Sequence, residues 1–501
     1  PRIRHFLSTE DGRLIPLRTT DIQLRVLGGS LAADGQYVEV SGRWTGPRSV
    51  PGATADRELD VSAVRYAAAP AGASVAASPS GAPILGSFPW VTVLCRFADH
   101  PTTEPHPLSW YTGLMGSSEP GMDHYWREVS FDQANVAGSL AVGWYDLPED
   151  HAAYVDGDNA DLTKLKNDCA AAADADVHFP DYIGINFQFN QPLGSFSWGG
   201  GSSLNIDGES RFYRMTWLAS WADHVTYAHE MGHGFGLPHS SGPYGNVYDS
   251  NWDVMSGAWT NHDATWGWVA PHTISYHKDM LGWIPSDRIF EPVEGSSQTL
   301  TLRRLADLGP GGDYLMIRVP LQDGTHYTVE ARRDLGYDTN LPAEAVILHH
   351  VDGRAFVVDP DNNGNPDDSG ARWLVGEIFE DGANGVTVAV DALTPEGYTV
   401  TIGFAEPGNI ALTPGTLNFA ADQGTDPAPQ VATLENTGTG ELSWAATSDR
   451  GWLTVGPTSG TLASTASTDL TVSVSTTGLA AGPHSGTVTV TGNADNSPQT
   501  I

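Results

Sequence analysis

The residues best suited to chemistry in this sequence are three histidines and one glutamate between positions 229 and 239, where the chain reads HEMGHGFGLPH. Residues four apart share one face of a helix, so His229 and His233 could present two imidazoles to one metal ion. Glu230 lies beside the first imidazole and could reach a water molecule without binding the metal itself. Gly236 can adopt a left-handed conformation that ends the helix and turns the chain, which would let His239 supply a third nitrogen. Three protein ligands leave a fourth position open, as a catalytic zinc requires.

The alternative interpretation of this segment is coincidence, with histidines that lie on a helix and are satisfied locally. In a chain of this composition, the five identities at this spacing arise by chance in about one sequence in ten thousand. We therefore predict a zinc site formed by His229, His233 and His239.

Residues 229–239 resemble the long zinc motif of the metzincin peptidases, and DVMSG at 253–257 resembles their Met-turn, in which Met255 would lie beneath the metal. Segments 251–256 and 275–285 are similar to the immune inhibitor A family of secreted bacterial metalloproteases. Apart from that family, the sequence resembles the gametolysin-like peptidases more than other metzincins. The resemblance spans about residues 84–405. It implies a secreted zinc endopeptidase that hydrolyses peptide bonds of extracellular proteins, with Glu230 as the general base. Met255 could instead be an ordinary core methionine.

The sequence departs from the metzincin pattern at one position. Some metzincins carry a tyrosine two residues after the Met-turn methionine, where it helps to hold the tetrahedral intermediate, and here Gly257 occupies that position. Tyr244 and Tyr248 lie nearby in the sequence and are the alternatives for this role. The resemblance also implies that the strand-like residues 196–206 line the cleft, where a peptide could add as an extra strand.

A second group of polar residues alternates oxygen-bearing side chains around Gly364, as calcium loops do. Position twelve of this loop is Gly370 and not glutamate, which excludes a complete EF-hand; a solvated acidic loop is the alternative. We predict structural calcium at Asp359, Asp361, Asn363, Asn365 and Asp367.

Two cysteines, Cys95 and Cys169, fall in a predicted buried strand and a predicted helix. They could be two buried free thiols, but in a secreted protein a disulfide is the favoured state. We predict a bridge between them.

The elements that would position these residues alternate between β and α patterns. We expect strands at 90–97, 139–147 and 182–189, helices at 122–129 and 162–173, and a helix from Asp223 through His233. Six further strands are expected between 286 and 405, and one of them spans 326–332. The predicted fold class is α+β multidomain, with a metzincin-type catalytic domain (a mixed sheet with the active-site helix) flanked by all-β domains.

Composition shifts predict an N-terminal β domain at 1–66, with one of its strands at 21–26, which would be a propeptide remnant or an accessory module, followed by a linker at 67–83. The metzincin domain would span 84–285 and a β-sandwich or jelly-roll 286–406. Residues 407–501 are expected to form an immunoglobulin-like module. Its segments 417–419, 436–438, 442–444 and 452–460 resemble BACON-type modules, which implies attachment to a glycan or glycoprotein; a plain spacer is the alternative.

Charge and hydropathy limit the partners of the 501-residue chain. Sixty acidic residues against 25 basic ones give a net charge of −35, and such a surface repels nucleic acids. No apolar run reaches the 18 residues of a membrane-spanning helix. The acidic balance fits an extracellular protein. The alternative function is a catalytically inactive surface- or glycan-binding protein that uses a metzincin scaffold.

Overall fold

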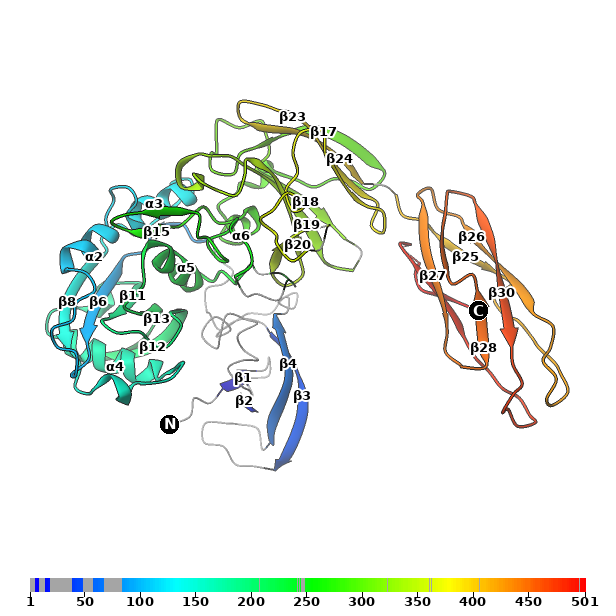
Figure 1. Ribbon diagram of the computed structural model, residues 1–501, viewed down its shortest axis with the longest axis horizontal. Helices are drawn as coiled ribbons and strands as arrows, with labels where there is room; N and C mark the ends of the chain where they lie inside the picture. The colour runs from blue at the N-terminus through cyan, green and yellow to red at the C-terminus, as the bar shows by residue number, and fades with distance from the viewer. Residues whose placement is uncertain are drawn as a thin grey trace. The chain divides into compact units, whose positions relative to one another are not determined.

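The structure is a computed structural model that describes residues 5–8, 14–18, 38–47, 57–66 and 83–501, except positions 207, 241, 243, 245–247, 322, 360, 362, 405 and 495 (Figure 1). The predicted strand at 21–26 and nearly all of the predicted linker lie outside these residues. The chain divides into two compact units. The first comprises residues 1–288, 303–316 and 328–372, and the second comprises 289–302, 317–327 and 373–501.

The predicted α+β fold with a metzincin-type catalytic domain is wrong. The described residues contain five α-helices, none longer than twelve residues, whereas strands form sheets along the whole described chain. The protein is therefore a multidomain β-rich chain. The prediction gave too much weight to the helical patterns between 84 and 285. Strand-forming segments rich in valine, threonine and aromatic residues occur before, between and after those short helices.

A five-stranded sheet in the first unit carries the candidate site. Its order is β12 (Trp198–Ile206), β13 (Glu209–Leu218), β11 (Gly184–Phe189), β6 (Trp90–Arg96) and β8 (Leu140–Asp146). The last four strands are parallel, and the outer strand β12 runs antiparallel to β13. The strands expected at 90–97, 139–147 and 182–189 are confirmed as β6, β8 and β11.

Helices α5 (His224–Phe235) and α4 (Leu162–Ala173) cover opposite faces of this sheet, and both were predicted. Successive side chains of β6 alternate between the faces, as the period of two requires. Trp90 and Leu94 belong to the core that contains Met231 of α5, whereas Cys95 belongs to the core that contains Leu165 of α4. The predicted disulfide between Cys95 and Cys169 is present and ties β6 to α4.

The remaining elements of the first unit are mostly short. A four-stranded sheet has the order β1 (His5–Ser8), β2 (Leu14–Arg18), β4 (Arg57–Tyr66) and β3 (Val38–Pro47). The other α-helices are α2 (Leu108–Leu114), α3 (Met122–Val129), which was predicted, and α6 (Ser275–Met280). The 3₁₀ turns are η1 (His151–Ala153), η2 (Phe179–Asp181), η3 (Ser286–Arg288) and η4 (Gly336–Asp338). The other strands are β5 (Gly86–Ser87), β7 (Ala134–Asn135), β9 (Val155–Asp156), β10 (Asn159–Ala160), β14 (Asn261–Asp263), β15 (Gly267–Val269), β20 (Ala345–Val351) and β21 (Ala355–Val357).

The second unit is made of strands. A four-stranded sheet has the order β17 (Ser296–Arg303), β24 (Gly397–Phe404), β23 (Val386–Leu393) and β22 (Ile378–Asp381). The strands β16 (Ile289–Phe290) and β18 (Met316–Pro320) also lie mainly here, and β19 (His326–Arg332) contributes its residues from 328 onward to the first unit.

The C-terminal residues of the second unit form two four-stranded sheets. One has the order β25 (Ile410–Thr413), β26 (Gln430–Asn436), β30 (Ser467–Val474) and β28 (Leu453–Gly456). The other has the order β29 (Ser459–Leu462), β27 (Leu442–Ser448), β31 (Val488–Gly492) and β32 (Gln499–Thr500). Side chains from both sheets, including Leu434 and Trp444, share one core. Among the described residues, no helix is both long and apolar enough to cross a membrane.

Candidate metal centre

Helix α5 carries two of the three predicted ligands, and its ends are fixed by its own sequence. At the start, the Asp223 carboxylate accepts a hydrogen bond from the Thr226 backbone N–H, which caps the helix. At the end, Gly236 has a φ of 99°, a left-handed conformation that glycine adopts without strain. The Leu237 N–H donates to the Gly232 carbonyl, so the chain reverses there and leads directly to His239.

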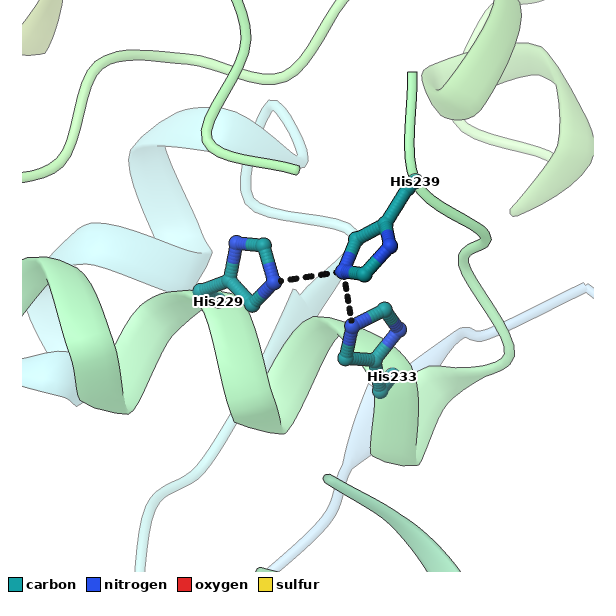
Figure 2. A group of neighbouring side chains, drawn as sticks. All are labelled: His229, His233 and His239. Carbon is teal, nitrogen blue, oxygen red and sulfur yellow. Dashed lines mark hydrogen bonds between the residues drawn. The ribbon is translucent and has the colours of Figure 1, made fainter. Parts of the chain in front are cut away.

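The three histidines converge on one point (Figure 2). The Nε2 atom of His239 lies 3.1 Å from Nε2 of His229 and 3.0 Å from Nε2 of His233. Nitrogens bound tetrahedrally at zinc distances would be separated by roughly 3.3 Å, which is close to both values. All three side chains are buried. The predicted ligand nitrogens are therefore already gathered at the spacing that zinc needs.

The hydrogen bonds of the Nδ1 atoms determine what the Nε2 atoms can do. Nδ1 of His229 donates to the Val254 carbonyl at 2.7 Å, and Nδ1 of His233 donates to the Leu237 carbonyl at 2.8 Å. A neutral imidazole that donates through Nδ1 presents an unprotonated lone pair at Nε2. Two such lone pairs face one histidine, whose single Nε2 could not satisfy both with one proton. A cation bound among the three nitrogens resolves this conflict, so the donor set fits zinc.

Burial keeps the imidazoles neutral, which is the form that binds metals. It lowers the pKa of His229 to about 4 and that of His233 to about 3, and it lowers the pKa of His239 well below its ordinary value. For His233 and His239, the neighbouring imidazoles lower the pKa further.

Met255 lies directly against the ligand-bearing helix. Its sulfur would be 2.5 Å from a Cβ atom at Gly232, a distance that only glycine permits. Met255 is fully buried, and its carbonyl accepts a hydrogen bond from the Ser240 N–H at 3.3 Å. The methionine therefore supports both the helix and the segment that follows His239.

A pocket of about 290 Å³ lies beside His229. Its lining includes His229 and Glu230, and the half-exposed Trp221 and Trp259 contribute apolar surface. Burial raises the pKa of Glu230 to about 8 in the metal-free chain, and a bound dication would favour its carboxylate form.

The two tyrosines considered for stabilising the transition state differ in their surroundings. The ring centroid of Tyr248 lies 5.6 Å from that of His229 and 5.2 Å from that of His239, and Tyr248 also lines the pocket. The Tyr244 hydroxyl instead donates to the Val357 carbonyl at 2.6 Å. Tyr248 is thus the tyrosine at the centre.

A buried charged network around Arg332 contacts the segment that leads to Met255, and it was not predicted from the sequence. Arg332 donates to Glu330 and Asp338 and to the Trp252 carbonyl, and all four residues are fully buried. A signal was present, because the predicted strand 326–332 has charges at positions 330 and 332, next to apolar ones. Without the tertiary contacts, these charges could equally have faced solvent.

The predicted calcium residues are only partly brought together. Carboxylate oxygens of Asp359, Asp361 and Asp368 lie within 4.8 Å of one another, and Asp368 was not among the predicted ligands. Asp367 instead accepts two hydrogen bonds from Asn251. Asn363 donates to two of the clustered carboxylates, Asp361 and Asp368, and Asn365 is exposed.

Comparison with known proteins identifies one part of the chain. A family model described as a viral BACON domain matches residues 409–501, so the C-terminal domain is a BACON domain, as its sequence predicted. No curated protein matches the chain. The match covers a minor part of the protein and does not include the metal centre.

Proposed function

We propose that this chain is a secreted zinc-dependent endopeptidase. The observation that carries the proposal is the convergence of three buried Nε2 atoms beside a pocket that is lined by Glu230. His229, His233 and His239 would hold the ion. When bound, zinc supplies an acidified water and polarises the scissile carbonyl.

Glu230 has the position and the chemistry of the proton carrier. It follows His229 on α5, it lines the pocket, and it is not a member of the histidine cluster. As a carboxylate it can take a proton from water, and as a carboxylic acid it can return that proton to the leaving amine. Tyr248, at the edge of the same pocket, is the group we assign to stabilise the developing oxyanion.

The outer strand β12 offers a way to bind an extended peptide. It is the last strand of its sheet, and Gly199 on this strand lies so close to α5 that a Cβ atom would be 2.1 Å from the Glu230 carbonyl oxygen. A peptide that paired with β12 would therefore run past the pocket and the histidines. Main-chain pairing of this kind favours proteins and peptides as the substrate class.

The resemblance of residues 229–239 and 253–257 to metzincin peptidases, and to the immune inhibitor A family within them, supports the proposal at the level of ligands and mechanism. The disulfide supports secretion because such bonds persist in oxidising compartments. The BACON domain would attach the enzyme to a glycan or glycoprotein. The rival function is a catalytically inactive surface-binding protein.

Hydrolysis of casein or gelatin by the purified zinc-loaded chain separates these two functions. The endopeptidase should cleave either protein, lose activity in 1,10-phenanthroline and regain it when zinc is restored. A zinc-loaded chain that leaves both substrates intact would favour the inactive binding protein.

A further inference from the structure

The loop that follows strand β21 gathers three carboxylates at one point. One carboxylate oxygen from each of Asp359, Asp361 and Asp368 lies within 4.8 Å of the others. Like charges at this separation repel one another unless a proton or a cation lies between them. Calcium prefers carboxylate oxygens and accepts six to eight oxygen ligands, some of them from water or backbone carbonyls.

Asp359 is the residue that distinguishes this cluster from an ordinary acidic loop. Its side chain is only 7% exposed, and neither carboxylate oxygen has a hydrogen-bond partner among the described residues. Burial raises its pKa, and the nearby carboxyl groups of Asp361 and Asp368 raise it further. An unpaired buried carboxylate is unfavourable, and a bound cation removes this penalty. The buried side chain is directed at the other two carboxylates.

Hydrogen bonds within the loop hold the carboxylates together. The Asn363 amide donates to Asp361 at 3.0 Å and to Asp368 at 2.6 Å. Its carbonyl oxygen accepts from the Asn365 N–H at 2.8 Å. Asn363 therefore acts as a bridge between two acidic side chains, whose remaining lone pairs are available to a cation.

Residues 366 and 367 of the same loop form hydrogen bonds with residues 251 and 252, which precede Met255 in the chain. Asp367 accepts hydrogen bonds from the N–H and the side-chain amide of Asn251, at 2.7 and 2.6 Å. The Pro366 carbonyl accepts from the indole N–H of Trp252, which is fully buried. These contacts hold residues 251 and 252 in place. Two residues further along, the Val254 carbonyl accepts the hydrogen bond that orients His229, and Met255 follows it.

We propose that this loop binds a calcium ion through Asp359, Asp361 and Asp368, and that the bound ion reduces the mobility of residues 251–255, which contact the histidines. The calcium site stands independently. Its effect on the histidines rests on the proposed zinc function, because only a bound zinc would reveal it. Calcium would act by holding the loop in the conformation in which Asp367 and Pro366 accept hydrogen bonds from Asn251 and Trp252.

Calcium chloride titrated into the full-length zinc-loaded protein tests the site directly, by calorimetry and by melting temperature. We expect one calcium per chain and a melting temperature that rises with calcium, because binding to the folded state alone stabilises it. Asp361→Asn should weaken calcium binding at least about tenfold, since affinity follows the ligand charge. Asp352→Asn, on an exposed turn of the same unit, is the matched control and should bind as the original does.

A missing calorimetric signal, or an equal loss in both variants, would overturn the site. Magnesium chloride should give a much smaller melting shift, and an equal shift would overturn the assignment to calcium.

Zinc release, followed with a fluorescent indicator, tests the coupling to the histidines. Calcium should slow zinc release from the original protein at least about threefold. Asp367→Asn should bind calcium normally, because the three clustered carboxylates stay in place. It should lose most of the calcium-dependent slowing of zinc release, because its hydrogen bonds to Asn251 are weakened. Calcium binding with an unchanged zinc release rate would overturn the coupling. A chain that binds no zinc would contradict the proposed function, while the calorimetric and melting results would still decide the calcium site.

Discussion

Two tyrosines close in sequence differ in what surrounds them, and this difference decides which one could act on a substrate. Tyr248 lies against the rings of His229 and His239, whereas the Tyr244 hydroxyl is engaged with the Val357 carbonyl. Spacing in the sequence could not separate them, because both tyrosines lie a few residues after His239 and neither falls at a fixed helical or strand spacing from it.

We expect Tyr248→Phe to lower kcat by about 10²-fold with KM little changed, since an oxyanion donor acts mainly in the transition state. Tyr244→Phe is the matched control and should keep kcat within about threefold. Steady-state hydrolysis of a short peptide by the zinc-loaded variants measures both effects. A larger loss in Tyr244→Phe would transfer the role to that residue.

At the scale of elements, the contact between Met255 and α5 explains a glycine in the middle of a helix. Glycine there costs about 1 kcal/mol relative to alanine by propensity alone. The sulfur of Met255 leaves no space for a Cβ atom at Gly232. The helix therefore tolerates a poor helix former in exchange for close packing beneath the histidines.

This contact predicts a non-additive pair of substitutions. Gly232→Ala alone should destabilise the unit by about 1–3 kcal/mol through overpacking. Made in a Met255→Ala background, the same change should cost less, because the clashing sulfur is gone. Urea unfolding of the four proteins, with zinc release as the signal of unfolding, gives the coupling energy between the two substitutions. Additive costs would mean that the two residues do not contact each other.

Helix α6 contains a buried lysine whose protonation should make the free energy of unfolding depend on pH. The Lys278 amine is fully buried, donates to the Val129 carbonyl at 2.6 Å and lies 2.9 Å from Nδ1 of His272. Burial lowers its pKa to about 7. Asp338, Glu330 and Glu128 raise this pKa, and Arg332 lowers it.

Because the pKa of Lys278 is lowered by folding, the unfolded chain binds the extra proton between pH 7 and about 10.5. Stability contributed by this group therefore rises with pH across that window, by at most about 1.4 kcal/mol per pH unit. Lys278→Met should remove this rise, which urea unfolding at pH 7.5 and 9.5 would measure. Lys164→Met, on α4, is the control and should keep the original slope. An unchanged slope in Lys278→Met would show that the lysine stays charged in the folded protein.

The elements closest to the site could be predicted from the sequence because their signals are local. The ligand spacing, the cap at Asp223 and the turn at Gly236 all lie within one short segment. The network around Arg332 could not be predicted, because it joins segments that meet only after folding. The choice of Asp368 over Asp367 for the carboxylate cluster depends on how the loop is folded, which residue spacing alone does not determine. The fold class was wrong for a related reason, since a strong helical motif says little about the strands that surround it.

At the scale of the whole molecule, the chain combines a candidate metal centre with a BACON domain that has its own core. Described residues of 409–501 form two packed sheets, and none of them belongs to the histidine cluster or lines its pocket. Domains with separate cores generally fold as separate units.

Deleting residues 409–501 should therefore leave zinc content unchanged and keep kcat/KM for a short peptide within about twofold. Activity on a large glycoprotein should fall more, if the domain attaches the enzyme to its substrate. Parallel assays of the two substrates measure this difference. Loss of zinc on deletion would mean that the C-terminal domain is part of the catalytic structure.

The central claim is that His229, His233 and His239 hold zinc while Glu230 moves the proton, and Glu230→Gln tests it most directly. The variant keeps the size of the side chain but cannot accept a proton. Zinc content by elemental analysis and peptide hydrolysis should be measured on the same preparation. We predict about one zinc per chain, as in the original protein, with kcat lowered at least about a thousandfold and KM little changed. A variant that loses its zinc, or that hydrolyses the peptide at the original rate, would contradict the account.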